Sequence, residues 1–344
     1  MKLNTERLKD FCKNVMQSAG VSAENAGEFA ESIVNADMRG VSSHGVTRLK
    51  TYYQRCRLGL VDPKAEPRIT AESPSLIAVD GCNALGVVSA GFAMRECIRR
   101  ARQTGVCFAA VKGGNHFGYA AYFAQMAERE GMIGFAAANG PVAIPPIGGR
   151  EPVLGTSPLA VTVPAGRCDP LELDMATSIV ARGKVKLAEK EGKPIPADWG
   201  IDAAGKPTTD PSAVKYLMPF GGAKGFGIGL VIEVLCSCLS GAKNAMNLGS
   251  LYDFSGKKQD SGFFVGALDV SKLMPVEAFK AETDALFGTI KASPRAEGVR
   301  EIFTPGEIEL NKARLAEQEG VEVGAAVLAE LQEVAADCGL PLPW

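Results

Sequence analysis

The sequence predicts an α/β protein. Two short apolar segments, 106–111 and 132–138, are separated by a glycine-rich turn and a helical segment, 119–130. Strand, turn, helix and strand in this order are typical of α/β folds. Both ends of the chain instead carry apolar residues at helical spacing. The Rossmann fingerprint G-x-G-x-x-G is missing. The segment that begins at Gly225 comes near it, but Leu230 stands where the third glycine would fall.

The first third of the chain is expected to be largely helical. Leu8, Phe11 and Val15 recur at helical spacing, and Gly20 supplies a stop signal. Ser22 is a suitable N-cap for a second helix. The expected helices are 5–20, 22–38, 45–58 and 84–104.

The rest of the chain alternates between candidate strands, loops and helices. The segments 139–149 and 189–211 are rich in Pro and Gly, and we expect loops there. A loop as long as the second is typically functional or mobile. The expected strands are 159–163, 171–175 and 263–268, and the expected helices are 226–239 and 307–338.

Composition excludes several classes of protein. The chain is 46% hydrophobic and 22% charged with a net charge of −2, which is ordinary for a globular protein and gives no footprint for nucleic acid. It has no apolar run long enough for a membrane span and no signal-like N-terminus. Nine scattered cysteines without a C-x-x-C pair indicate a reduced, cytoplasmic protein with no metal site.

Only two histidines are present, and each lies in a short glycine-containing motif. His44 lies in 42–48 (SSHGVTR) and His116 in 113–118 (GGNHFG). Histidine is suited to proton transfer near neutral pH because its unperturbed pKa is about 6.5. His116 also follows a strand and precedes a helix, where α/β folds commonly place sites. A structural role fits isolated loop histidines equally well at this stage.

Arg48 follows His44 by four residues and would share a helix face with Tyr52. A guanidinium matches a carboxylate with two parallel hydrogen bonds. The pair of Arg48 and His44 therefore suits a substrate with a carboxylate beside a carbonyl or hydroxyl group. The same spacing also fits an arginine that caps carbonyls or pairs with a surface acid.

Two further motifs suit a phosphate-containing ligand. The segment 221–229 (GGAKGFGIG) precedes an apolar helix and carries Lys224, so its backbone amides could face a phosphate. Its glycines fit close helix packing equally well. Asp174 ends a strand-like run, where a carboxylate holds a ribose, orients a histidine or caps the next helix.

Together, these motifs resemble the type-2 malate/L-lactate dehydrogenase family. Its members include ureidoglycolate and sulfolactate dehydrogenases, diketogulonate reductase and reductases of cyclic imino acids. The resemblance runs in order from about residue 5 to residue 340. It rests on RGVSSHGVTR (39–48), NHFG (115–118), GTSPLA (155–160), DMAT (174–177), ARGK (181–184), PTTDP (207–211) and GGAKG (221–225).

The resemblance implies an NAD(P)-dependent oxidoreductase with a non-Rossmann fold that acts on a small 2-hydroxy or 2-oxo carboxylic acid. It implies a homodimer, and NAD is favoured over NADP as the cofactor. The implied helical domain comprises 1–60 and 300–344, followed by an α/β segment at 61–120 and a cofactor-binding domain at 121–299.

The resemblance also assigns roles to individual residues. His116 is the expected proton-transfer residue and His44 the one that polarises or orients the substrate, although the residues alone leave these two roles interchangeable. The expected substrate contacts are Ser43, Arg48, Tyr52 and Thr156. The expected cofactor contacts are Asn139, Asp174, Met175, Ala176, Lys224, Gly225, Pro305, Gly306 and Glu307.

One departure from the family pattern affects the substrate. The segment 139–141 (NGP) replaces the Asn-Ser or Thr-Asn type of turn expected in several members, which removes a side chain near the nicotinamide or substrate. Two alternatives to the dehydrogenase hypothesis stay open. One is a reductase of cyclic imino acids, and the other is a ligand-binding dimer without catalysis.

Overall fold

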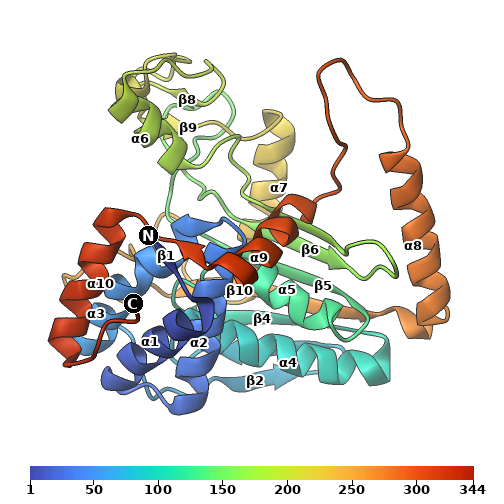
Figure 1. Ribbon diagram of the computed structural model, residues 1–344, viewed down its shortest axis with the longest axis horizontal. Coiled ribbons are helices and arrows are strands. Elements are labelled where there is room, and N and C mark those ends of the chain that lie inside the picture. The colour runs from blue at the N-terminus through green and yellow to red at the C-terminus, as the bar shows by residue number, and fades with distance from the viewer.

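The computed structural model describes residues 1–344 and is built around one mixed sheet of seven strands (Figure 1). The strand order is β2-β3-β4-β10-β5-β6-β7. Only β3 and β4 are parallel, and the other neighbours are antiparallel. The strands are β2 (Arg68–Glu72), β3 (Leu76–Asp80), β4 (Val106–Gly114), β5 (Met132–Ala138), β6 (Leu159–Val163), β7 (Leu171–Met175) and β10 (Ser261–Asp269).

Helices cover both faces of this sheet. Because side chains alternate along a strand, Phe263 and Val265 of β10 face the core beneath α4 (Gly86–Thr104) and α5 (Ala121–Glu128). Phe264 faces the opposite side, toward α7 (Ala223–Glu233). A π-helical segment, η4 (Val234–Leu239), continues α7.

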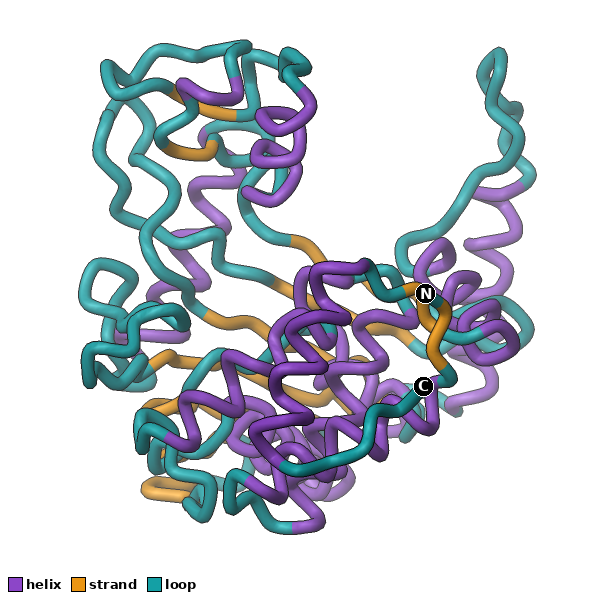
Figure 2. The backbone as a smooth tube through the Cα atoms, turned by 60° about the vertical axis from the view of Figure 1, so that its left-hand side comes forward, coloured by secondary structure: helices purple, strands orange, loops and turns teal.

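The two ends of the chain form a helical layer beside the sheet (Figure 2). Its helices are α1 (Thr5–Ser18), α2 (Ala23–Met38), α3 (Leu49–Arg57), α9 (Glu307–Glu319) and α10 (Ala325–Cys338). The short strands β1 (Lys2–Leu3) and β11 (Val321–Glu322) pair antiparallel and tie the two ends together. One continuous hydrophobic core extends from these helices to the face of the sheet beneath α4 and α5.

Two parts of the chain project from this body (Figures 1 and 2). One comprises α6 (Arg182–Glu191), β8 (Gly200–Ile201) and β9 (Tyr216–Leu217), with a small apolar cluster of its own. The other is α8 (Val276–Lys291) with the loop that leads to α9. None of the helices is both long and apolar enough to cross a membrane.

The segment 45–58 is not one helix, which corrects the sequence-based expectation. Two single 3₁₀ turns, η1 (Ser42–His44) and η2 (Val46–Arg48), precede α3. The Asp37 carboxylate accepts a hydrogen bond from the Val46 N–H at 2.7 Å. A Cβ at Gly45 would overlap that carboxylate, so glycine is required at this bend.

The expected helix at 307–338 is also interrupted. Gly320 has a φ of +88° and ends α9, and the chain then forms β11 before α10 begins. A side chain at Gly320 would press on the Leu3 backbone, so the pairing of the two chain ends requires this break. Helical periodicity in the sequence continues across it because α9 and α10 both present apolar residues to the same core.

Several elements were not expected from the sequence. They are β2, β3, α6 and α8. Strand β2 is mostly exposed and α6 buries only Val185, so neither carries a clear apolar pattern. The expected loop at 189–211 begins within α6 and contains β8. The sheet takes strands from both 61–120 and 121–299, and the division of the chain into domains there stays a prediction.

Candidate active site

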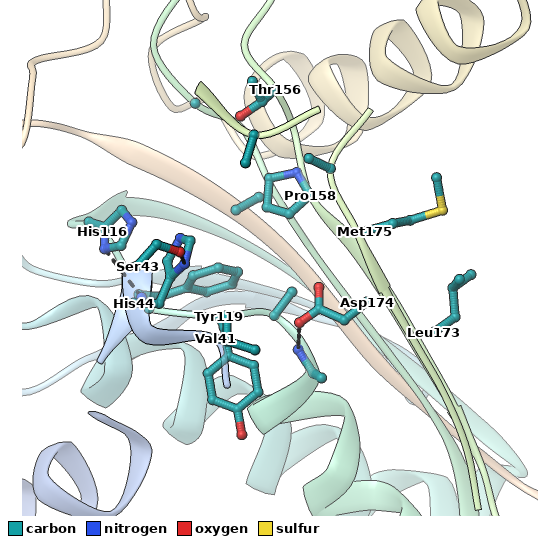
Figure 3. A pocket seen from close by; sticks show the side chains of 18 of the residues that line it. Val41, Ser43, His44, His116, Tyr119, Thr156, Pro158, Leu173, Asp174 and Met175 are labelled. Atoms are coloured by element: carbon teal, nitrogen blue, oxygen red, sulfur yellow. Dashed lines mark hydrogen bonds between the residues drawn. The ribbon is translucent and has the colours of Figure 1, made fainter. Parts of the chain in front are cut away.

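A cavity of about 530 Å³ lies between the helical layer and the β5–β7 side of the sheet. Ligand sites commonly have volumes of about 300–1,000 Å³. Figure 3 shows Ser43, His44 and His116 gathered on one side of this cavity and Asp174 and Met175 on the other. The cavity thus joins the two groups of residues that the sequence analysis singled out separately.

His116 is held from three directions. The Tyr52 hydroxyl lies 2.5 Å from Nδ1, and the Gly118 N–H donates to the same nitrogen at 3.3 Å. The His116 backbone N–H donates to Oε1 of Gln259 at 3.0 Å. No protein group bonds Nε2, so this ring nitrogen is left for a ligand.

The turn that carries His116 rests directly on the start of α4. Gly86 opens this helix, and a Cβ at Gly86 would overlap the carbonyl oxygens of Asn115 and His116. The buried Asn115 side chain donates to Ala84 O at 2.8 Å and to both oxygens of Asn83. The position of His116 is therefore set by backbone packing as well as by its own hydrogen bonds.

His44 stacks on His116. The two ring centroids are 5.5 Å apart and the planes are inclined by only 11°. Oγ of Ser43 lies 2.9 Å from His44 Nδ1. Asp37, beneath this turn, holds the Val46 N–H, and burial raises its pKa to about 7. The two histidines are 72 residues apart in the sequence, and their motifs meet in the structure through the stacked rings.

Both imidazoles are neutral at physiological pH. Burial lowers the pKa of His44 to about 4 and that of His116 to about 3. The Arg48 charge adds to the effect on both rings, and His44 adds to the effect on His116. Burial raises the pKa of Tyr52, so its hydroxyl keeps its proton. A neutral imidazole is the form that accepts a proton.

We expect neither histidine to titrate near its usual pKa of 6.5. The pKa of each buried ring lies below its value of about 6.5 in the unfolded chain. The unfolded state therefore takes up protons first as the pH falls, and the stability that the fold has above about pH 6.5 is lost progressively toward about pH 4. The measurement is an NMR titration of the two imidazole Cε1–H signals, assigned with His44→Gln. Unchanged signals from about pH 8 to about pH 5 are expected. A midpoint near 6.5 for either ring would contradict the environment described.

Arg48 lies behind the Ser43–His44 turn. Its Nε donates to Ser43 O at 2.7 Å, and its guanidinium lies over the Tyr252 ring, 5.2 Å from the centroid. Arg48 lines a neighbouring cavity of about 330 Å³, whereas Ser43 lines both this cavity and the main one. The Arg48 side chain is therefore close enough to the histidines to affect their pKa values, but it does not line the main cavity.

Asp174 marks the far side of the cavity. Its carboxylate is accessible from the cavity and accepts the Ala121 N–H at 3.1 Å. Desolvation of the carboxylate by the protein around it raises its pKa to about 6. Six of the expected cofactor contacts line the cavity: Asn139, Asp174, Met175, Ala176, Pro305 and Gly306. The α9 N-terminus has no side-chain cap at Gly306. The Glu307 N–H donates to Thr304 O at 3.2 Å, which leaves the next two amides, of Ile308 and Glu309, for an acceptor.

The remaining expected cofactor contacts lie elsewhere. Lys224 lines a separate apolar cavity between α7 and the sheet. Gly225 is buried, and a Cβ there would overlap Phe220 O, which is the packing role that the sequence left open. Glu307 pairs with Lys291 and accepts the Thr304 N–H at 3.0 Å. Of the expected substrate contacts, Ser43 and Thr156 line the main cavity, and Tyr52 reaches it through His116.

Three important residues were missed at the level of sequence. Gln259 lines the cavity and holds His116, Asp37 supports the His44 turn, and Tyr252 covers Arg48. Each acts across a long sequence separation or from within an ordinary helix, so no local motif marks it.

A fourth feature of the cavity wall is the buried ion pair between Arg39 and Glu172. Arg39 opens the motif that contains His44, and Glu172 lies on β7 beside Asp174. The guanidinium is therefore already paired within the wall.

Nearly the whole chain matches a known family. The family model described as malate/L-lactate dehydrogenase matches residues 3–332. This chain belongs to the malate/L-lactate dehydrogenase family. The family and the α/β, non-Rossmann fold class inferred from the sequence are thereby confirmed, and the chain is a member of a dehydrogenase family.

Relatives of differing activity resemble it over their full length. The L-sulfolactate dehydrogenase of Methanocaldococcus jannaschii is 35% identical over 99% of this chain and 98% of its own. The crystal structure of malate dehydrogenase from Entamoeba histolytica has a TM-score of 0.94 at 29% identity, covering 100% and 99% of the two chains. The Δ1-piperideine-2-carboxylate reductase of Pseudomonas syringae has a TM-score of 0.85 at 27% identity, covering 97% and 100%.

Proposed function

We propose that this protein transfers a hydride between a nicotinamide dinucleotide and C2 of a small 2-hydroxy or 2-oxo carboxylic acid. The observation that carries the proposal is the pair of stacked, neutral imidazoles at one side of a cavity of about 530 Å³ whose other side carries Asp174. Membership of a dehydrogenase family supports the same reaction class.

His116 is the proposed proton-transfer residue. In oxidation, Nε2 takes the hydroxyl proton of the substrate, and in reduction it returns one. For Nε2 to accept, the neutral ring must carry its proton on Nδ1, which then donates to the Tyr52 hydroxyl at 2.5 Å. In this tautomer Nδ1 no longer accepts the Gly118 N–H, whose contact at 3.3 Å is the longer of the two. His44, stacked on His116 and bonded to Ser43, orients the substrate.

Arg48 is the proposed partner of the substrate carboxylate. Its charge already acts on both histidines, and a bound carboxylate would balance it. Ser43 lines the cavities on both sides of the turn and would contact the same group. Thr156 borders the main cavity on the sheet side and is the remaining proposed substrate contact.

The far side of the cavity suits the dinucleotide. Asp174 would accept from ribose hydroxyls, the uncapped start of α9 at Pro305 and Gly306 would face the pyrophosphate, and Asn139, Met175 and Ala176 would line the site. When bound, the nicotinamide supplies the hydride acceptor or donor. Lys224, Gly225 and Glu307 remain predicted contacts that would need to reach the cofactor from outside this cavity.

We propose NAD as the preferred cofactor. The far side of the cavity carries the carboxylates of Glu172, Asp174 and Glu309, and its cation Arg39 is already paired with Glu172. The extra phosphate of NADP would bring further negative charge to this wall without a free guanidinium to receive it.

A homodimer is the proposed assembly. Helix α7 and the start of η4 expose a row of apolar side chains, because Leu230, Val231 and Val234 are 46%, 60% and 47% exposed. An apolar surface of this kind is typical of a buried interface. We expect twice the chain mass by light scattering, and a shift toward monomer in Val231→Asp but not in Leu58→Asp, at an exposed position just after α3. A monomeric wild type would contradict the proposal.

The proposed reaction is tested with purified protein and a panel of substrates. Absorbance of the reduced cofactor is followed with NADH or NADPH and pyruvate, oxaloacetate, sulfopyruvate, oxalurate, diketogulonate or a cyclic imine. Turnover of a 2-oxo acid, faster with NADH, is expected. Turnover of the imine alone would replace the proposal with imino acid reduction, the activity named for the Pseudomonas syringae enzyme. If no substrate of the panel were turned over and neither cofactor raised the melting temperature of the protein, the non-catalytic alternative would be the one that remains.

A further inference from the structure

Arg55 is fully buried and has no carboxylate partner. It lies on α3, and its side chain is 0% exposed. It forms none of the ion pairs in the structure. Burial lowers its pKa, which reflects the cost of removing a guanidinium from water. A buried charge of this kind must be stabilised by other polar groups.

The polar groups that surround Arg55 are backbone carbonyls of one distant segment. Nη1 donates to Asp253 O at 2.8 Å, to Leu251 O at 3.2 Å and to Ser250 O at 3.4 Å. Nη2 donates to Lys257 O at 3.5 Å. The guanidinium therefore gathers four carbonyls from residues 250–257, about 200 residues away in the sequence.

Few other contacts hold this segment in place. It belongs to the irregular stretch 241–260 between η4 and β10. Leu251 is buried in the main core, but Tyr252 and Phe254 are 56% and 41% exposed. Four carbonyls that share one cation are thus a main determinant of the conformation of the segment.

Residues 250–259, here called the Arg55-bound segment, contact the active site at two points. The Tyr252 ring lies beneath the Arg48 guanidinium at 5.2 Å. Oε1 of the buried Gln259 accepts the His116 N–H at 3.0 Å. One contact restrains the proposed carboxylate partner, and the other restrains the proposed proton-transfer residue.

Helix α3 and its N-cap residue carry three groups that meet this segment or His116. Arg48 stands at the N-cap position, Tyr52 follows four residues later and Arg55 three residues after that. This spacing places them along one helix face. Arg48 meets Tyr252, Tyr52 meets His116, and Arg55 holds the backbone between these contacts.

We propose that Arg55 is a positioning residue that shapes the Arg55-bound segment, and that Tyr252 sets how Arg48 receives the substrate carboxylate. This inference rests on the proposed function and extends it to a segment outside the family motifs recognised in the sequence. Arg55 touches neither the cavity nor the histidines, so it acts through Tyr252 and Gln259.

Tyr252 provides the first test because its exposure makes misfolding on substitution a minor concern. Tyr252→Leu should raise KM for the acid substrate about threefold to tenfold with kcat nearly unchanged, since a cation–π contact restrains Arg48. Tyr252→Phe keeps the ring and should restore the wild-type KM. Phe254→Leu, in the same segment, is the matched control. Unchanged KM in Tyr252→Leu would overturn the role of Tyr252.

Arg55→Lys provides the second test, with the exposed Arg57→Lys on the same helix as its control. Lysine cannot span four carbonyls with a planar fork. We expect kcat/KM to fall about tenfold or more, as for lost hydrogen bonds to a charged group. The His116 Cε1–H signal should move, and trypsin should cleave faster after Lys257 or Lys258. Wild-type kinetics together with an unmoved His116 signal would overturn the role of Arg55.

Different results would contradict the proposed function and the inference about Arg55. If the wild-type enzyme turned over no acid, the proposed function would fall, while the His116 signal and the trypsin cleavage would still decide whether Arg55 shapes the segment. If the wild type were active and Arg55→Lys matched Arg57→Lys in every readout, only the inference about Arg55 would fall.

Discussion

His116→Gln is expected to lower kcat for 2-hydroxy acid oxidation by about 10²–10⁴-fold, the usual loss when a general base is removed. Glutamine retains polarity near the cavity but accepts no proton. KM should change little, because the carboxylate is proposed to bind Arg48 rather than His116. Steady-state kinetics with the best acid of the panel measure both constants.

His44→Gln separates the two histidines. It removes the ring that stacks on His116 at 5.5 Å but leaves the Tyr52–His116 hydrogen bond in place. We expect a smaller loss of kcat and a larger change in KM than in His116→Gln. If His44→Gln lost kcat and His116→Gln lost only affinity, the two proposed roles would have to be exchanged.

Gly86→Ala is expected to reduce activity strongly although Gly86 lies outside the catalytic groups. The added methyl overlaps the carbonyl oxygens of Asn115 and His116, so the turn must move. Overpacking of this kind costs about 1–3 kcal/mol of stability. A displacement of about 1 Å at a reacting group costs about 10²-fold in rate. Thermal unfolding and kcat/KM measure the two effects.

Gly27→Ala is the matched control for this substitution. Gly27 lies within α2, and a Cβ there meets no neighbouring atom. Alanine should leave activity unchanged and slightly stabilise the helix. Equal activity in Gly86→Ala and the wild type would show that the position of His116 does not depend on its contact with α4.

Parts of the site were accessible from the sequence because their signals are local. The scarcity of histidine and the glycines around His44 and His116 indicated both imidazoles. The four-residue spacing of Arg48 and Tyr52 placed them together, although a 3₁₀ turn rather than one continuous helix produces the arrangement. Asp174 was found at the end of a strand, and it faces the same cavity.

Other parts depend on contacts between distant segments and leave no local pattern. Gln259 reaches His116, and Arg55 reaches Asp253, only after β10 has been inserted between β4 and β5. The break at Gly320 follows from the pairing of the two chain ends. Lys224 looked suited to a phosphate beside its glycines, yet it lines an apolar cavity on the other face of the sheet.

The most direct test of the central claim follows the hydrogen at C2 of the substrate. The acid that the enzyme oxidises is prepared with deuterium at C2 and incubated with the wild-type protein and oxidised cofactor. Mass spectrometry of the reduced cofactor is expected to find the deuterium there, and His116→Gln should transfer it more slowly. Reduced cofactor without deuterium, or no reduction with any 2-hydroxy acid, would contradict hydride transfer from C2 in this cavity.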